Sequence, residues 1–254
     1  MKSRYEAILN NIALSSIDSK ILILDIKPTK PDLQYNTFKT AKRDGARINR
    51  RYIGSIGVTI SFGIYEYNIR KRQDICSEIA KWAKNGGVLE TNDRDGQFLR
   101  CVCYKQPIVE SAMEWTKPLS ITFIAYEIPY WQEKQPVSKT ITGTSATGTL
   151  FVPGSVDGAL VEVSAKANAS VSSFELGVNG RKLTLSGLSL TTNQVVTITY
   201  DDEAIQSIKV GSTSILNKRT GVDDLLAKCG ENNNLSLSAS ASVSATFSVR
   251  GLWV

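Results

Sequence analysis

The chain has no histidine among its 254 residues. Without one, no serine or cysteine can be activated by a histidine of this chain, as it is in triad and dyad enzymes. Histidine-ligated metal sites are also excluded, together with the most common general base near neutral pH. An enzyme without histidine would have to use carboxylate, lysine or tyrosine side chains for catalysis. No catalytic motif appears, so we expect no enzyme, no catalytic residue, no cofactor and no metal site.

Cysteine is scarce, and its four positions form no recognisable pair. They are Cys76, Cys101, Cys103 and Cys229. None belongs to a C-x-x-C motif of the kind that holds zinc or carries out redox exchange. Cys101 and Cys103 are two residues apart in a strand-like stretch and therefore share one face. We interpret all four as reduced thiols. A glycine-rich phosphate loop of the Walker or dinucleotide type is missing too.

Long hydrophobic runs are also missing. No stretch approaches the roughly 18 apolar residues that a membrane-spanning helix needs. The first residues, Met1-Lys2-Ser3-Arg4, are not followed by the apolar segment of a signal peptide. Residues 21–26 are apolar except for Asp25 and form only a short run, which favours a buried strand. We expect synthesis and assembly in the cytoplasm of the cell, without membrane insertion.

The composition changes sharply at a seam between residues 129 and 148. Lysine and arginine number 21 in residues 1–138 and 9 in residues 139–254, while aspartate and glutamate number 15 and 9. The first part therefore carries the whole net charge of +6, and the second part is neutral. Serine and threonine follow the opposite trend, with 17 and 30. We expect two domains, 1–138 and 139–254.

The first part has the periodicities of a β domain with one helix. Apolar residues alternate with small or polar ones from Ile56 to Ile64, which predicts a half-buried strand. Ile75, Ile79, Trp82 and Ala83 share one helical face, so residues 74–84 should form a helix that Asp74 begins and Asn85-Gly86-Gly87 ends. A hairpin is expected from residues 88–90 and 98–104, and further strands at 21–26 and 119–126.

The second part is expected to be almost purely β. Residues 140–149 indicate a linker or an edge strand, and Val222–Cys229 a short helix that begins with a capping box at Thr220 and Asp223. Alternation is clearest from Leu235 to Arg250, where apolar positions alternate with serine or threonine. Regular short strands favour a sandwich or jelly roll. The remaining strands are predicted at 159–167, 182–185, 195–200, 204–210 and 212–216, with turns at Asn179-Gly180, Asp201-Asp202 and Gly211.

Acidic clusters are the candidates for catalysis. They lie at Asp93 and Asp95 and at Asp201-Asp202-Glu203. A glycosidase needs two carboxylates facing each other across a groove, but these clusters fall in predicted turns, where aspartate bonds local backbone. Asp93-x-Asp95-Gly96 resembles the start of a calcium loop, yet the later ligands are missing. We interpret both clusters as turn residues.

Basic and aromatic residues offer two binding hypotheses. A basic face could follow a phosphate backbone, with Tyr52 and Tyr67 stacking on bases. Asp44 and Glu66 interrupt this face, so we favour a solvated or subunit-contacting surface. Exposed aromatic residues near the domain ends could stack on sugars, although core closure and interdomain packing are the preferred explanation. The basic residues are Lys39, Lys42, Arg43, Arg47, Arg50, Arg51 and Arg70-Lys71-Arg72, and the aromatic ones are Tyr130, Trp131 and Trp253.

Five stretches, taken in order, form a recognisable series. The first four are Arg43-Asp44-Gly45 leading into Ile56–Ile64, Ile79–Ala83 followed by Gly87–Glu90, Gly96–Val102, and Leu119–Phe123 leading to Pro129-Tyr130-Trp131. The fifth, in the second part, is Leu226-x-x-x-Gly230-x-Asn232 before the last strand. In their order and spacing these stretches resemble the distal tail protein (Dit) family of long-tailed, non-contractile phages, and the resemblance covers essentially the whole chain.

The resemblance implies a structural protein of the virion tail tip. Residues 1–138 would be a split β-barrel with one helix, related to tail-tube proteins, that forms a homohexameric ring. Residues 139–254 would be a peripheral galectin-like or jelly-roll β-sandwich. The implied partners are the tail tube protein and the tail tip, lysin or baseplate proteins. DNA would pass through the ring without sequence recognition.

Two other functions stay open. The first is a carbohydrate-binding adhesion module in which the second domain contacts the host surface. The second is a glycosidase that uses Asp201 and Asp202, for which the sequence offers much less.

Overall fold

The computed structural model describes residues 4–29, 33–38, 47–107, 117–125, 128–201 and 204–254. The chain divides into two compact units, Met1–Trp131 and Gln132–Val254. This division lies inside the compositional seam. Among the described residues, no helix is long and apolar enough to cross a membrane.

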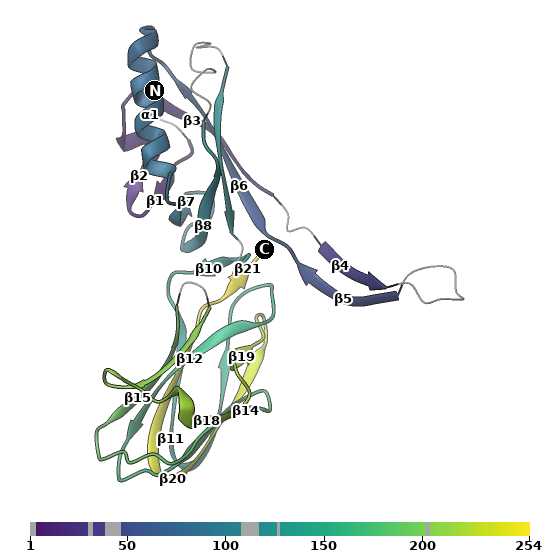
Figure 1. Ribbon diagram of the computed structural model, residues 1–254, viewed down its shortest axis with the longest axis vertical. Helices are drawn as coiled ribbons and strands as arrows, with labels where there is room; N and C mark the ends of the chain where they lie inside the picture. The colour runs from purple at the N-terminus through teal and green to yellow at the C-terminus, as the bar shows by residue number, and fades with distance from the viewer. Residues whose placement is uncertain (1–3, 30–32, 39–46, 108–116, 126–127, 202–203) are drawn as a thin grey trace. The chain divides into compact units, whose positions relative to one another are not determined.

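The first unit is built on a curled antiparallel sheet (Figure 1). Its strands lie in the order β2–β1–β7–β8–β9–β6–β3. The alternation that predicts strand 56–64 is confirmed, because every second residue of β6 faces the core, with Ile60 and Phe62 fully buried. The bounds are β1 Ala7–Leu9, β2 Ile12–Ala13, β3 Ile21–Pro28, β6 Ile56–Ile64, β7 Gly87–Thr91, β8 Gln97–Lys105 and β9 Leu119–Ala125, with a 3-10 turn at Leu14–Ser16.

One helix, α1 (Ile69–Ala83), packs on the buried face of this sheet. Ile75 and Ile79 are buried, and the Trp82 ring meets Phe123 of β9 edge-on at 5.9 Å. The predicted start at Asp74 is wrong, because α1 begins about one and a half turns earlier. The Asn68 side chain caps it by accepting hydrogen bonds from the next turn, so Asp74 lies inside the helix.

A second, separate sheet consists of β4 (Leu33–Phe38) and β5 (Arg47–Ile53), which pair antiparallel. The predicted Asp44-Gly45 turn between them lies outside the described residues. Within the described ranges neither strand pairs with a third one. A two-stranded ribbon of this kind is marginally stable in water by itself.

The predicted helix stop at Asn85-Gly86-Gly87 is confirmed. Gly86 has a φ of +62° and Gly87 one of +133°. A Cβ at Gly86 would lie 2.2 Å from the carbonyl oxygen of Cys101, and one at Gly87 would lie 2.1 Å from the side chain of Asn10. Both positions therefore need glycine for its backbone conformation and for the close approach of neighbouring chain.

We expect Gly86→Ala to destabilise the protein by more than about 3 kcal/mol, since backbone must move to admit the Cβ. Gly96 is the matched control, because its φ is +80° but nothing lies within 4 Å of an added Cβ. Gly96→Ala should cost about 1–2 kcal/mol, from the left-handed conformation alone. Urea unfolding measures both, and equal losses would contradict the role given to the Cys101 carbonyl.

The regular elements among the described residues of the second unit are β-strands and one 3-10 turn at Leu216–Lys218. Strands predicted at 159–167 and 195–200 are observed with those bounds. The predicted edge strand at 140–149 is part of a longer one, β11. The bounds are β10 Trp131–Glu133, β11 Val137–Phe151, β12 Ala159–Ala167, β13 Phe174–Val178, β14 Arg181–Leu185, β15 Val195–Tyr200, β16 Gln206–Val210, β17 Thr213–Ser214, β18 Arg219–Gly221, β19 Leu226–Ala227, β20 Asn232–Val249 and β21 Leu252–Trp253.

The 18-residue strand β20 organises this unit. Along one side it pairs with β11; along the other, Val243–Val249 pairs with β12 and Leu235–Ala239 pairs with β13. The register with β11 shifts at the same place, since Gly143 lies opposite Val243 while Ser145 lies opposite Ser238. One strand thus belongs to two runs of strands, an arrangement that forms the corner of a sandwich.

Serine and threonine on β20 face outward and bond the neighbouring strands. Thr140 and Thr142 of β11 lie opposite Thr246 and Ser244, with hydroxyl oxygens 2.8 and 3.0 Å apart. The Ser240 hydroxyl accepts from the backbone N–H of residue 172 at 3.0 Å. The apolar alternate positions, such as Val243 and Phe247, are buried. The predicted alternation over 235–250 is confirmed.

The predicted helix at Val222–Cys229 is wrong. That segment is irregular apart from the short strand β19, and its backbone bonds the neighbouring strands. Val222 N–H donates to the Lys182 carbonyl, and the Leu225 carbonyl accepts from Val161 N–H. The Asp223 carboxylate, expected to cap a helix, instead binds the Arg219 guanidinium at 2.7 Å. Tertiary hydrogen bonds therefore outweigh the local capping pattern.

Asn233 fixes the start of β20 from inside the protein. Its side chain is 1% exposed. Its Oδ1 accepts from Lys228 N–H and from Asn179 Nδ2, each at 2.7 Å, and its Nδ2 donates to the carbonyls of Lys228 and Leu150. The turn expected to end on Asn232 is thus held by the next residue.

Replacing Asn233 with alanine should destabilise the fold by about 2–4 kcal/mol, because buried donors and acceptors lose their partner. Asn232→Ala, one residue earlier and exposed, is the control and should change the unfolding free energy by less than about 0.5 kcal/mol. Similar effects of the two substitutions in thermal or chemical unfolding would contradict this account.

Candidate assembly surfaces

The acidic residues proposed for catalysis are turn residues in the structure. Asp93 and Asp95 are exposed in the loop between β7 and β8. The Asp201 carbonyl accepts a hydrogen bond from Ala204 N–H at 3.0 Å, and its carboxylate accepts one from Ile205 N–H at 2.8 Å. These bonds close a tight turn. Asp202 and Glu203 lie outside the described residues. In the described part of the chain, no three acidic or cysteine side chains are grouped to hold a metal ion.

The cysteines are free and largely enclosed. Cys76, Cys101 and Cys229 are buried, and Cys103 is half-buried. Burial raises the pKa of the Cys101 thiol to about 12, which keeps it protonated at physiological pH. A thiol without thiolate character is a poor nucleophile and metal ligand. The structure therefore places Cys76, Cys101 and Cys229 in the core.

The basic residues that the structure describes are divided between two elements, α1 and β5. Arg72 is 3% exposed, and its Nε donates to the carbonyl of Glu66 at 3.0 Å, whereas Arg70 and Lys71 are exposed on the first turn of α1. The other basic residues follow a different element. Arg47, Arg50, Arg51 and Tyr52 are on β5, while Lys39, Lys42 and Arg43 lie outside the described residues.

Glu66 ties the start of α1 to the sheet. Its carboxylate forms an ion pair with Lys20, next to the start of β3, and accepts the Asn68 N–H at 3.0 Å. Asn68 in turn caps the helix. The hydrogen bond from Lys20, followed by that from Asn68, lowers the pKa of Glu66 to about 2. The residue expected to interrupt a nucleic-acid face is thus a structural link.

The lowered pKa predicts how stability depends on pH. Because Glu66 has a lower pKa in the folded than in the unfolded chain, its carboxylate stabilises the fold above pH 4.5, and this contribution is lost as pH falls toward 2. Glu66→Gln should therefore lower the thermal midpoint at pH 6 and change it little at pH 2. Glu78→Gln, which removes the exposed pair with Lys81, is the control. An equal effect of Glu66→Gln at both pH values would contradict the prediction.

The three candidate sugar-stacking aromatics are largely enclosed. Trp131 is 1% exposed, and the Arg94 guanidinium lies 5.0 Å from its ring centroid. Trp253 is half-buried, and its Nε1 donates to the Glu133 carboxylate at 2.7 Å. Tyr130 is also half-buried, and burial raises the pKa of its hydroxyl. These contacts support the packing interpretation.

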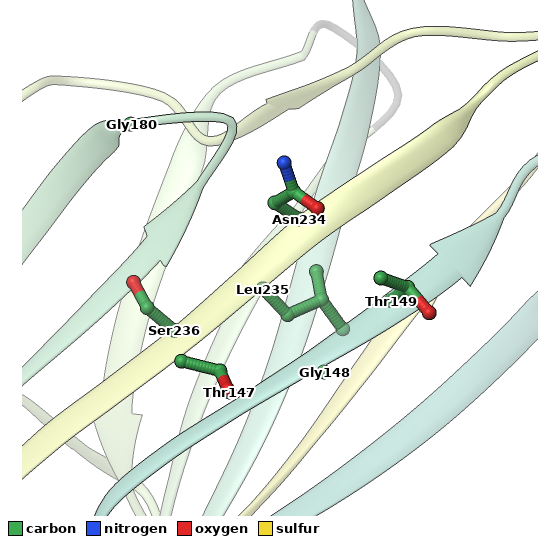
Figure 2. Close-up of a pocket in the computed structure, with 7 residues that line it drawn as sticks. All are labelled: Thr147, Gly148, Thr149, Gly180, Asn234, Leu235 and Ser236. Atoms are coloured by element: carbon green, nitrogen blue, oxygen red, sulfur yellow. The ribbon is translucent and has the colours of Figure 1, made fainter.

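A shallow hollow of about 470 Å³ lies over the β11–β20 pair (Figure 2). Thr147 and Thr149 of β11 and Asn234 and Ser236 of β20 line it, with Gly180 at one end. Its lining offers hydroxyl and amide groups but no aromatic ring and no charge. Such a surface can hydrogen-bond a polar chain, but it has no platform for a sugar ring.

Open strand edges and exposed apolar side chains mark the surfaces of the first unit. Among the described residues, β3 and β2 end the sheet on its two sides, and β4–β5 stands alone. Tyr65, Tyr67 and Ile69, just before and at the start of α1, are 56%, 87% and 52% exposed. Unpaired strand edges and exposed apolar side chains of this kind often form subunit contacts.

Comparison with known proteins gives a result at the level of fold. No protein-family model matches the sequence, and no curated protein matches it. Among solved structures, the Dit protein of phage SPP1, described as a paradigm of the hub adsorption apparatus in phages infecting Gram-positive bacteria, superposes with a TM-score of 0.71 over 97% of this chain and 98% of that one, at 10% identity. This chain has the Dit fold.

The Dit fold confirms the expected fold class, a mainly β chain with a curled sheet and one helix first and a second β part after it. A chain of the phage P2 baseplate in its activated conformation with calcium is also similar, with a TM-score of 0.49, 9% identity and 97% coverage of both chains. That likeness is too low to carry an argument.

Two structural residues, Asn68 and Asn233, could not be predicted from the sequence, because their amide side chains have no periodic signal.

Proposed function

We propose that this chain is a structural, non-enzymatic hub at the distal end of a phage or prophage tail. The observation that carries the proposal is the shared fold with the SPP1 Dit protein across nearly the whole of both chains. A single shared domain would leave the role open, since common β folds serve many functions. Here both units, in the same order, are covered.

The first part, residues 1–138, is the ring-forming domain of this proposal. Open edges at β2 and β3 and the isolated β4–β5 ribbon would be completed by neighbouring copies in a homohexamer. Pairing with a neighbouring copy would also stabilise the β4–β5 ribbon, which is marginally stable by itself. The tail tube would bind one side of the ring and the tail tip, lysin or baseplate proteins the other, after assembly in the host cytoplasm.

The sheet face opposite α1 suits a passage for DNA. On the central strands β6 and β9 it carries Thr59, Ser61, Ser120 and Thr122, all half-buried and uncharged. Thr59 and Thr122 bond each other with hydroxyl oxygens 3.1 Å apart. Tight binding to a phosphate backbone requires lysine and arginine. On the neighbouring strand β3 the same face carries Lys27 and Asp25, which lie opposite Thr59 and Ser61 and form an ion pair with each other at 3.1 Å. A lumen lined by hydroxyl groups and by charges that cancel would let DNA pass without holding it.

The second part, residues 139–254, is the peripheral domain. The carbohydrate-binding alternative has weaker support, because the hollow on β11 and β20 lacks the aromatic ring that sugar recognition uses. We therefore assign this domain to protein contacts at the tail tip.

The mass of the assembly tests this proposal. The full chain, alone and co-expressed with the tail tube and tail tip proteins of the same genome, should sediment as a six-copy ring or as a complex containing six copies. Sedimentation velocity and native mass spectrometry measure this directly. A monomer of 27.8 kDa in both preparations would contradict the ring.

A further inference from the structure

The longest open strand edge in the second unit belongs to β11. This strand runs for 15 residues and, in the part of the chain that the structure describes, pairs with β20 alone. Each free edge presents backbone N–H and C=O groups that can pair with another strand, and natural proteins usually protect such edges. The protection of β11 is limited to its first half.

Three protective features lie outside residues 145–151. Lys139 is the one charged residue of β11, and the bulge at Gly143/Ser145 separates it from the second half. Pro136 and Pro153 lie beyond the two ends. Residues 145–151 (SATGTLF) therefore have no charge, no proline and no irregularity, and Phe151 is 54% exposed. Such a seven-residue segment is suited to strand pairing.

The hydrogen bonds of β20 show which residues of β11 point their backbone outward. Asn179 N–H donates to the Asn234 carbonyl at 2.9 Å, so Asn234 faces β13. Its neighbour Leu235 then faces β11, because successive residues of a strand point their backbone groups to opposite sides. Leu235 lies opposite Gly148. Gly148 is therefore bonded to β20.

The same alternation assigns the rest of the segment. Ala146 and Leu150, like Gly148, direct their backbone groups to β20, whereas Ser145, Thr147, Thr149 and Phe151 direct theirs to the open side. The outward groups thus sit on every second residue. Figure 2 shows Thr147, Gly148 and Thr149 on β11 beside Ser236, Leu235 and Asn234 on β20.

We propose that β11 is a homotypic contact: residues 145–151 of two copies of this chain pair antiparallel about a two-fold axis at Gly148. In this register Thr147 lies opposite Thr149 of the second copy, and Ser145 lies opposite Phe151. All four positions have outward backbone groups, so each pair exchanges two hydrogen bonds. The contact is isologous, as in most closed dimers.

Three features favour a second copy over a different partner. Gly148 would face itself in a pair without backbone hydrogen bonds, where the two Cα atoms approach to about 4.5 Å, and glycine fits this approach best. No charge in the segment opposes its own copy. Threonine–threonine pairs across strands are also the chemistry that β11 already uses with β20.

The proposal does not depend on the ring, because it involves the second unit alone. A seven-residue strand pair buries far less than the roughly 1,200 Å² of a stable specific interface. The pairing is therefore weak and concentration-dependent in solution. The pairing becomes strong when two assemblies that each hold several copies of the chain meet, because their linked β11 contacts then act at high effective concentration.

Proline substitution separates the open side of β11 from the side bonded to β20. Thr149→Pro removes an outward N–H and leaves the β11–β20 ladder intact, so the variant should fold and its self-association constant should fall about tenfold or more, from the two hydrogen bonds lost across the axis. Ser138→Pro is the matched control, with an outward N–H outside the paired segment. Sedimentation of the full chain over a concentration series measures the self-association constant of both variants.

The same experiment distinguishes this contact from the ring. If the first unit forms six-copy rings, the Thr149→Pro variant should keep the mass of one ring and lose the pairing of two rings. A wild type without concentration-dependent association, or a folded Thr149→Pro variant that associates like wild type, overturns the proposal.

Charge exchange tests the register without proline. Lysine at both 147 and 149 places like charges opposite each other across the axis and should abolish self-association, as should glutamate at both positions. Mixing the two double variants should restore association as a mixed pair, and salt should weaken it. If the mixture stays dissociated, the Gly148-centred pairing is wrong.

Discussion

The structure of the second unit depends on one constraint, which is that β20 must pair on both sides while serving two runs of strands. Its outward residues are serine or threonine, and its inward residues include alanine at 239, 241 and 245. Small side chains let the strand change partner between Ala239 and Val243, from β13 to β12. The hydroxyl groups on its outer face then bond the neighbouring strands. The serine-rich composition of this part is therefore a condition of the fold.

The strands with strict alternation could be predicted from sequence, as β6 and β20 show, because burial on one face imposes a period of two. Elements defined by contacts far along the chain could not. The helix expected at 222–229 fails because Lys182 and Val161 bind its backbone. The start of α1 depends on Asn68 and Glu66, and Glu66 is positioned by Lys20 from another part of the chain. Of the residues considered for catalysis or sugar binding, Asp201 closes a turn, Asp93 and Asp95 are exposed in a loop, and Trp131 and Trp253 have packing or hydrogen-bond contacts.

The two units differ in how they expose pairing groups. Within its described residues, the first has open edges at the ends of its sheet and a ribbon that no described strand completes, with apolar side chains exposed near the start of α1. The described part of the second encloses its core and leaves one long edge, on β11. This difference parallels the change in composition, in which the charged residues concentrate in the first part and the hydroxyl residues in the second. The proposed division into an assembling domain and a displayed domain would account for both.

We propose that this chain belongs to the distal end of a phage tail. Immunoelectron microscopy of virions produced from the genome that encodes it tests this claim most directly, with antibodies raised against the full chain. The account predicts gold label at the tip of the tail, opposite the capsid, on most particles. Label on the capsid or along the tail shaft, or purified infectious particles without this chain, would contradict it.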